Sequence, residues 1–140
     1  MAIQHYKDLI VWQKAMDLVC LVYEATRAFP KEELYGLTSQ IRRAVVSVPS
    51  NIAEGQARKS TAEFRNFLSF ARGSMAEVET QLILARRLNY LQETQLHEIM
   101  SIHEEVNKML STLMSKLVVS GERPVARGER ASKRSVNTGH

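Results

Sequence analysis

Apolar residues recur at steps of three and four through four stretches of this sequence, and this spacing constrains the fold more than any other feature. It places the apolar side chains of each stretch along one side of an α-helix. The pattern predicts helices over residues 8–28, 37–57, 60–88 and 92–119. Helices of comparable length with short connections pack most simply with antiparallel neighbours. We therefore expect an all-α chain that forms an up-down-up-down four-helix bundle.

Residues that cap or break helices set the limits of these segments. Asp8 can cap the first helix, and Pro30 ends it because the residue before a proline is pushed out of the helical region. Ser60 and Glu63 have the spacing of a capping box, which starts the third helix. Gly121 is expected to stop the fourth helix.

Core positions follow from the same periodicity. The first helix is predicted to bury Leu9, Trp12, Met16, Val19, Tyr23 and Thr26. The second helix is predicted to bury Leu37, Ile41, Ala44, Val45, Val48, Ile52 and Gly55. Pro49 lies inside this second helix and removes one backbone donor, so either a bend or a break is expected there.

Composition indicates one domain and a separate tail. With 140 residues and 44% apolar content, the chain can bury a core without disulfides or metals. We expect the bundle to span residues 1–120 and a disordered basic tail to span residues 121–140. The single cysteine, Cys20, is expected in the interior, and a lone thiol fits a reducing cytoplasm. No apolar run approaches the ~20 residues that cross a membrane.

Two helices carry apolar residues on more than one side, which predicts an oligomer. Residues on a second side of the second helix, and on a stripe beside the main seam of the third, are Val46, Pro49, Ala53, Phe70, Leu84 and Leu88. Exposed apolar stripes are a liability on a monomer, and symmetric self-association usually covers them. The alternative is that the connectors or the bend at Pro49 cover these residues.

The sequence predicts no catalytic centre, metal site or cofactor. His97 and His103 share a helix, but the residues three positions earlier, Thr94 and Met100, are not the glutamates that metal-binding bundles use. His103 lies on the apolar seam and is predicted to be a core histidine with a satisfied ring nitrogen. No glycine-rich elbow or loop frames a serine nucleophile or a phosphate. We expect a protein that is not an enzyme.

Basic residues are the remaining candidates for binding. The helical ones to test for contact with nucleic acid are Arg42, Arg43, Arg58, Lys59, Arg65 and Arg72. Arg65 and Arg72 lie seven apart on one face, which suits a basic stripe that binds successive phosphates. A mixed charge face is more often simply solvated, because Glu63, Glu77 and Glu79 are close by. Arg43 and Glu54 are expected to pair with charges on the third helix.

Several segments resemble a known family. They are Tyr6-Lys7-Asp8-Leu9-Ile10-Val11-Trp12-Gln13-Lys14-Ala15, Gly36-Leu37 with Gln40-Ile41-Arg42-Arg43-Ala44, Val48-Pro49-Ser50-Asn51-Ile52-Ala53-Glu54-Gly55, and Glu77-Val78-Glu79-Thr80-Gln81-Leu82. They resemble the bacterial four-helix-bundle family named for proteins encoded in intervening sequences of 23S ribosomal RNA genes. The resemblance spans about residues 6–118.

The resemblance implies a four-helix bundle, commonly a ring-like homopentamer, without known enzymatic activity. More distantly, the family is similar to the accessory protein of diversity-generating retroelements, which implies a basic surface for nucleic acid and a reverse-transcriptase-like partner. Two hypotheses follow. The chain is either a homo-oligomeric bundle that binds RNA or DNA, or a protein-interaction scaffold whose charges serve solubility.

Overall fold

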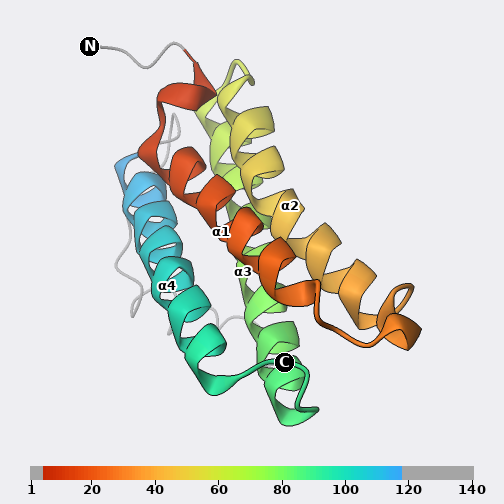
Figure 1. Ribbon diagram of the computed structural model, residues 1–140. Coiled ribbons are helices and arrows are strands. Elements are labelled where there is room, and N and C mark those ends of the chain that lie inside the picture. The colour runs from red at the N-terminus through yellow and green to blue at the C-terminus, as the bar shows by residue number, and fades with distance from the viewer. Residues whose placement is uncertain (1–4, 118–140) are drawn as a thin grey trace, which may run out of the picture.

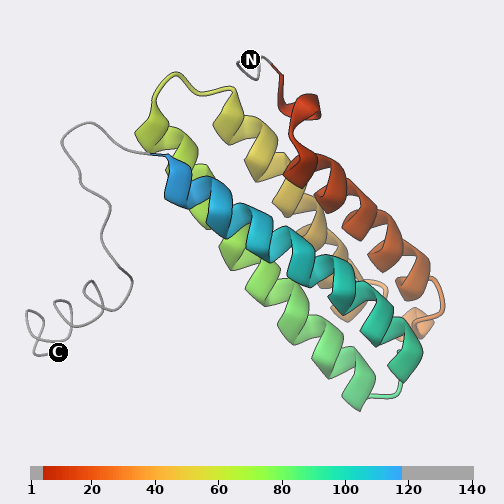
Figure 2. The same ribbon diagram turned by 90° about the vertical axis from the view of Figure 1, so that its left-hand side faces the viewer.

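The computed structural model describes residues 5–117, and within them all regular structure is helical. Four α-helices run Ile10–Thr26 (α1), Leu37–Gln56 (α2), Thr61–Arg87 (α3) and Glu93–Lys116 (α4). Two short 3₁₀ turns, η1 at Tyr6–Asp8 and η2 at Lys31–Glu33, precede α1 and α2. Successive helices run in opposite directions and pack as a bundle in the order α1, α2, α3, α4, with α4 returning to α1 (Figures 1 and 2). The predicted all-α class is confirmed. The predicted tail, residues 121–140, lies outside the described residues.

Helix starts differ in part from the predictions. Asp8 does not cap α1, because residues 6–8 form the turn η1 and Leu9 takes the cap position without a side-chain hydrogen bond. Ser60 does cap α3, since its hydroxyl accepts a hydrogen bond of 3.1 Å from the Glu63 amide. The Glu63 carboxylate accepts from that same hydroxyl at 3.1 Å, rather than from the Ser60 amide.

The core of α2 is buried as predicted, whereas that of α1 is predicted only in part: Leu9 and Thr26 are buried, and Trp12 and Val19 are half-buried. All seven positions predicted to face inward on α2 are buried. On α1 the buried side is rotated by about one residue, so that Val11, Ala15, Leu18, Val22, Ala25 and Thr26 face the core. Met16 and Tyr23 are exposed, and so is Cys20, which was expected inside. Helix α1 has apolar residues on most of its sides, so periodicity alone could not select the buried one.

Pro49 is accommodated inside a continuous helix. Helix α2 runs unbroken from Leu37 to Gln56, which excludes the predicted alternative of a break. Proline has no amide hydrogen, so the carbonyl four residues earlier loses its usual partner. Nearby side chains bond to the backbone of the same stretch: the Ser47 hydroxyl donates to the Ala44 carbonyl at 2.7 Å, and the Asn51 amide donates to the Ser47 carbonyl at 2.8 Å.

Small residues bring α2 and α3 close together. Gly55 of α2 faces Phe64 and Phe67, and a Cβ atom at Gly55 would lie 2.7 Å from the Phe67 Cβ. Further along the same pair, the hydroxyl oxygens of Ser47 and Ser74 lie 2.5 Å apart, within hydrogen-bond distance. Close backbone approach increases the number of van der Waals contacts between the helices. Gly55 is therefore a structural requirement of the α2–α3 contact.

A polar clasp joins the two connections at the other end of the bundle. Asn89 has a φ of 65°, and the Tyr90 amide donates to the Ala85 carbonyl at 2.9 Å, which ends α3 in a Schellman motif. The Tyr90 hydroxyl donates to Glu33 Oε2 at 2.9 Å. The other carboxylate oxygen of Glu33 accepts from the Leu37 amide at 3.0 Å and so caps α2. One carboxylate thus ties the α1–α2 connection to the α3–α4 turn.

We expect the hydrogen bond between Tyr90 and Glu33 to stabilise the fold less at high pH. The hydrogen bond to Glu33, followed by burial and the negative charges of Glu33 and Glu32, raises the pKa of Tyr90 above its ordinary value. A raised pKa means that the folded state favours the protonated phenol. The stabilisation is therefore complete below the unfolded pKa of about 10 and is lost as the pH rises through the folded pKa.

We expect the difference in free energy of unfolding between the wild type and Tyr90→Phe to be largest near neutral pH and to shrink above about pH 10. Urea denaturation followed by circular dichroism between pH 7 and 11 measures it. A difference that stays constant up to pH 11 would show that the phenol proton does not contribute.

Candidate nucleic-acid interface

The structure does not gather the six predicted basic residues into one patch. Arg42 serves the contact between α1 and α2: its Nε donates to Thr26 Oγ1 at 2.9 Å. Its guanidinium lies 4.6 Å from the centre of the Tyr23 ring. Arg42 is thus half-buried and helps to hold α2 against the end of α1.

Arg43 lies apart from Arg58 and Lys59, which are at the turn between α2 and α3. Arg43 is exposed and lines a hollow of about 330 Å³ together with Glu77. Arg58 Nη2 pairs with Glu54 Oε2 at 3.0 Å, and its guanidinium lies over the Phe67 ring. The expected pairing of Glu54 with α3 is therefore wrong, because the partner is one helical turn away on the same chain segment. Lys59 is exposed.

Arg65 and Arg72 lie on the side of α3 that faces α4. Arg72 Nη1 approaches the Met114 sulfur of α4 at 4.0 Å. Arg65 is half-buried and lies two turns earlier on the same side of α3. These two residues share a face, as their spacing predicted, and that face continues onto α4.

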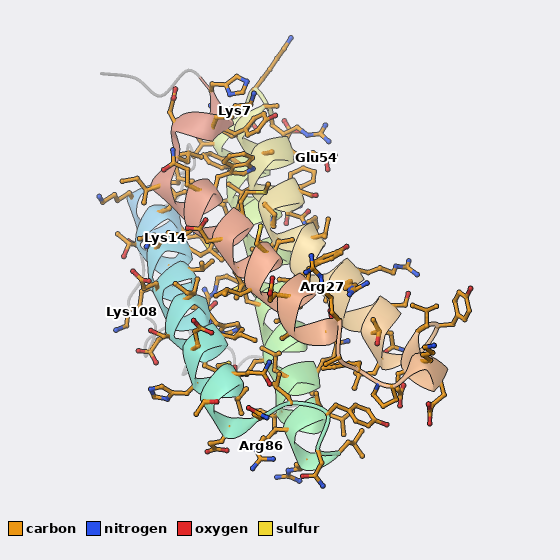
Figure 3. All side chains as sticks on the ribbon, viewed as in Figure 1. Lys7, Lys14, Arg27, Glu54, Arg86 and Lys108 are labelled. Atoms are coloured by element: carbon orange, nitrogen blue, oxygen red, sulfur yellow. The ribbon has the colours of Figure 1, made fainter. Side chains whose placement is uncertain are left out.

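An open groove between α3 and α4 carries the strongest candidate site. Its volume is about 600 Å³, and we call it the α3–α4 groove; it is lined by Arg72, Ala76, Glu79, Asn107, Lys108, Ser111 and Thr112. Two cations from different helices and three uncharged hydrogen-bond donors thus border one surface. Lys108 projects into solvent (Figure 3) and lies 3.6 Å from Glu104. Exposed pairs of this kind are weak, so the lysine can exchange its partner for a phosphate.

The sequence pattern did not predict the residues that α4 contributes to this groove. Asn107, Lys108, Ser111 and Thr112 occur in an amphipathic helix whose polar side is ordinary for a solvated surface. Only the packing of α4 against α3 places them opposite Arg72. Basic residues spaced along one helix were detectable in the sequence, whereas a site shared by two helices was not.

Apolar side chains are exposed on two other surfaces of the bundle. Val46 is 38% exposed, Phe70 51%, Leu84 44% and Leu88 45%, while Ala53 is half-buried. Pro49 corrects the expectation, because it is buried within its own chain and offers no surface to a partner. For Pro49, the alternative expectation holds, because the chain itself covers this residue. The others remain candidates for an interface.

Val46 lines a hollow of about 670 Å³ between α1 and α2, which we call the α1–α2 hollow. Its other apolar side chains are Tyr23 of α1 and Leu34 and Tyr35 of the connection before α2. The rest of its lining is polar or charged: Thr38, Ser39, Arg42, Arg43, Ser47 and Ser50. The Tyr35 side chain is 93% exposed. Large aromatic side chains that stand free in solvent beside such a hollow are typical of contact surfaces.

The histidines and acidic residues of the described chain form no metal-binding cluster. Within residues 5–117, no three His, Cys, Asp or Glu side chains lie close enough to hold a metal ion. His103 is 2% exposed, and its Nε2 lies 2.7 Å from the Met75 carbonyl oxygen of α3. The prediction of a core histidine with a satisfied ring nitrogen is confirmed. Among the same residues, no helix is both long and apolar enough to span a membrane.

Comparisons with known proteins agree with this architecture. A crystal structure of a protein of unknown function from the S23 ribosomal protein family of Bacteroides thetaiotaomicron shares the fold with a TM-score of 0.69. The two chains are 26% identical, and the match covers 75% of this chain and 95% of that one. No curated protein matches the chain significantly. The family model for 23S rRNA-intervening sequence proteins matches residues 7–112. Since this match spans most of the chain, the protein belongs to the 23S rRNA-intervening sequence protein family.

Proposed function

We propose that this protein is a non-enzymatic cytoplasmic accessory protein that assembles with copies of itself and binds the phosphate backbone of RNA or DNA. The observation that carries the proposal is the α3–α4 groove, where Arg72 and Lys108 approach one open surface from two helices. The family resemblance adds a homopentamer and a reverse-transcriptase-like partner to the proposal.

The chemistry of the groove suits a phosphodiester backbone. Arginine and lysine supply the charge that displaces counterions from phosphates. Hydroxyl and amide side chains, here Ser111, Thr112 and Asn107, make the uncharged contacts that fix a backbone in place. Glu79 at the same groove opposes a continuous run of phosphates and limits the number of contacts. We therefore expect modest affinity without base specificity.

A protein scaffold is the second candidate, and a specific observation favours it. The exposed apolar residues on α1, α2 and α3 are the kind that protein interfaces bury. Arg42 and Arg58, two of the six basic candidates, are already engaged by their own chain. In this reading the charges of the α3–α4 groove serve solubility alone.

Removing the two groove cations separates these functions. We expect Arg72→Ala combined with Lys108→Ala to weaken binding to a fluorescent RNA hairpin or DNA duplex by tenfold or more at low salt. The plot of log K against log salt should become shallower by about two, since each phosphate contact contributes roughly one. Fluorescence anisotropy over a salt series measures both quantities.

The matched control removes the same charges elsewhere. Arg27 and Lys31 are exposed residues at the α1–α2 connection, and Arg27→Ala combined with Lys31→Ala should leave the slope nearly unchanged. Equal losses in the two double variants would mean that net charge, rather than the groove, attracts the nucleic acid. Absence of wild-type binding at low salt would leave the scaffold function.

A further inference from the structure

The α1–α2 hollow combines aromatic, cationic and hydroxyl side chains, and no residue that lines it is acidic. Tyr35 lines this hollow with 93% of its side chain exposed. Within the described chain, no other aromatic ring and no cation packs against the ring of Tyr35. A free aromatic face of this kind is a surface on which another planar ring can stack.

Arg43 is the cation that remains available in this hollow. Its guanidinium is exposed and makes no hydrogen bond or ion pair with any other residue of the described chain. Arg42 lines the same hollow, but it is held by Thr26 and Tyr23. Arg43 also borders the smaller hollow that contains Glu77, yet the two side chains form no ion pair. Because a guanidinium binds phosphate through two parallel N–H donors, Arg43 supplies an anion site close to an aromatic one.

Thr38 adds a buried hydroxyl group to the same lining. Its side chain lines the hollow and the residue is only 4% exposed. The Thr38 Oγ1 atom has no hydrogen-bond partner among the residues that the structure describes. A buried hydroxyl without a partner costs free energy, and a polar group of a bound ligand can offset that cost. Ser39 and Ser50 contribute two further hydroxyl groups.

We propose that the α1–α2 hollow binds a nucleotide whose base is unpaired, with the base stacked on Tyr35 and the phosphate bound by Arg43. Stacking on a protein ring requires a base that is splayed out of a double helix, because paired bases present only their edges. The lack of carboxylates in the lining suits the charge of a phosphate.

The dimensions of the hollow agree with such a ligand. Its volume of about 670 Å³ lies within the range of roughly 300–1,000 Å³ that small-molecule sites have. Helix α2 begins at Leu37, two residues after Tyr35, and Arg43 lies about 9 Å further along its axis. Both side chains are long, so they can contact opposite ends of one nucleotide.

The inference goes beyond the proposed function, which assigns the phosphates of RNA or DNA to the α3–α4 groove. None of the residues of that groove lines the α1–α2 hollow, so the two sites are separate. An unpaired stretch of nucleic acid and a free mononucleotide both present the same base and phosphate. The experiment therefore tests each source separately.

The first measurement is fluorescence anisotropy of an oligodeoxyadenylate strand, and of the duplex that it forms with its complement, with full-length variants. We expect Tyr35→Ala to weaken binding of the strand by about five- to 150-fold, the effect of losing one base stack, and to leave duplex binding unchanged. Tyr35→Phe keeps the ring and should bind the strand as the wild type does. Circular dichroism should show equal helix content, because Tyr35 is exposed.

Arg43→Gln tests the phosphate contact. It should weaken binding of the strand and lower the slope of log K against log salt by about 0.7, the contribution of one phosphate in a single strand. Arg87 is an exposed arginine of α3 that lines neither site, so Arg87→Gln should leave this slope nearly unchanged. Equal effects of the two variants would contradict a phosphate site at Arg43.

The second measurement is calorimetric titration with adenosine monophosphate. Saturable binding that Tyr35→Ala abolishes would support the proposal and identify free nucleotides as ligands. Binding of the strand alone, weakened by Tyr35→Ala, would support it and identify unpaired nucleotides of a nucleic acid. The proposal fails if the wild type binds neither probe, if Tyr35→Ala binds as the wild type does, or if it loses duplex and strand equally. The proposed function fails on a different result, namely duplex binding that Arg72→Ala combined with Lys108→Ala does not change.

Discussion

Replacing Gly55 with alanine is expected to lower the free energy of unfolding by about 1–3 kcal/mol, although alanine is the better helix former by about 1 kcal/mol. The added Cβ would lie 2.7 Å from the Phe67 Cβ, 3.1 Å from a ring carbon of Phe64 and 3.3 Å from the Phe64 carbonyl oxygen. A Cβ atom cannot rotate away as the end of a long side chain can. Helices α2 and α3 must therefore move apart, and the contacts along their length weaken.

Gly73 provides the matched control for this prediction. It lies within α3, and no heavy atom would come within 4 Å of a Cβ placed there. Gly73→Ala should therefore raise the free energy of unfolding by about 0.5–1 kcal/mol through helix propensity alone. Urea denaturation of both variants measures the contrast. If Gly55→Ala were as stabilising as Gly73→Ala, α2 and α3 would not be held together as closely as described.

Truncating His103 is expected to have the other large effect on stability. The imidazole is buried between α3 and α4, and Nε2 must carry a proton, because the Met75 carbonyl oxygen only accepts. His103→Ala removes this hydrogen bond and leaves a cavity in the core. We expect a loss of about 2–4 kcal/mol in the free energy of unfolding, as for other large buried side chains.

Leucine at the same position separates packing from hydrogen bonding. His103→Leu keeps most of the volume and loses only the donor, so a smaller cost of about 1 kcal/mol is expected. Chemical denaturation of both variants gives the two values. Equal losses would mean that the hydrogen bond, and not the filled volume, is what His103 contributes.

Helix α2 shows why much of this fold is readable from sequence. Most of its large apolar residues, such as Ile41, Val45 and Ile52, occupy one side, and the second side carries only Val46, Pro49 and Ala53, so the pattern selects the buried face. In helix α1 the same pattern is ambiguous. Trp12, Met16 and Tyr23 form a second apolar side that competes with Leu18 and Val22, and only the packing of the other helices decides between them.

The candidate site was less accessible to sequence reasoning than the fold. Arg42 attracts attention as a cation, yet its partner Thr26 lies sixteen positions away, where no local pattern reveals it. The ion pair of Arg58 with Glu54 is readable from their spacing of four, but its contact with the Phe67 ring is not. Lys108 shows the reverse case, because its importance depends on Arg72 of another helix. The Glu33–Tyr90 clasp, which joins residues 57 positions apart, is likewise invisible to periodicity.

Sedimentation velocity of the wild-type protein with a fluorescent nucleic acid, as the salt concentration rises from about 50 to 200 mM, tests nucleic-acid binding and self-association together. Nucleic acid bound at a charged groove should be released steeply over this range, whereas association through apolar surfaces should persist. We therefore expect the protein to keep a mass that is a fixed multiple of 15.9 kDa while the nucleic acid dissociates. A protein that runs as a single chain throughout, or that binds no nucleic acid at the lowest salt, would contradict the proposed function.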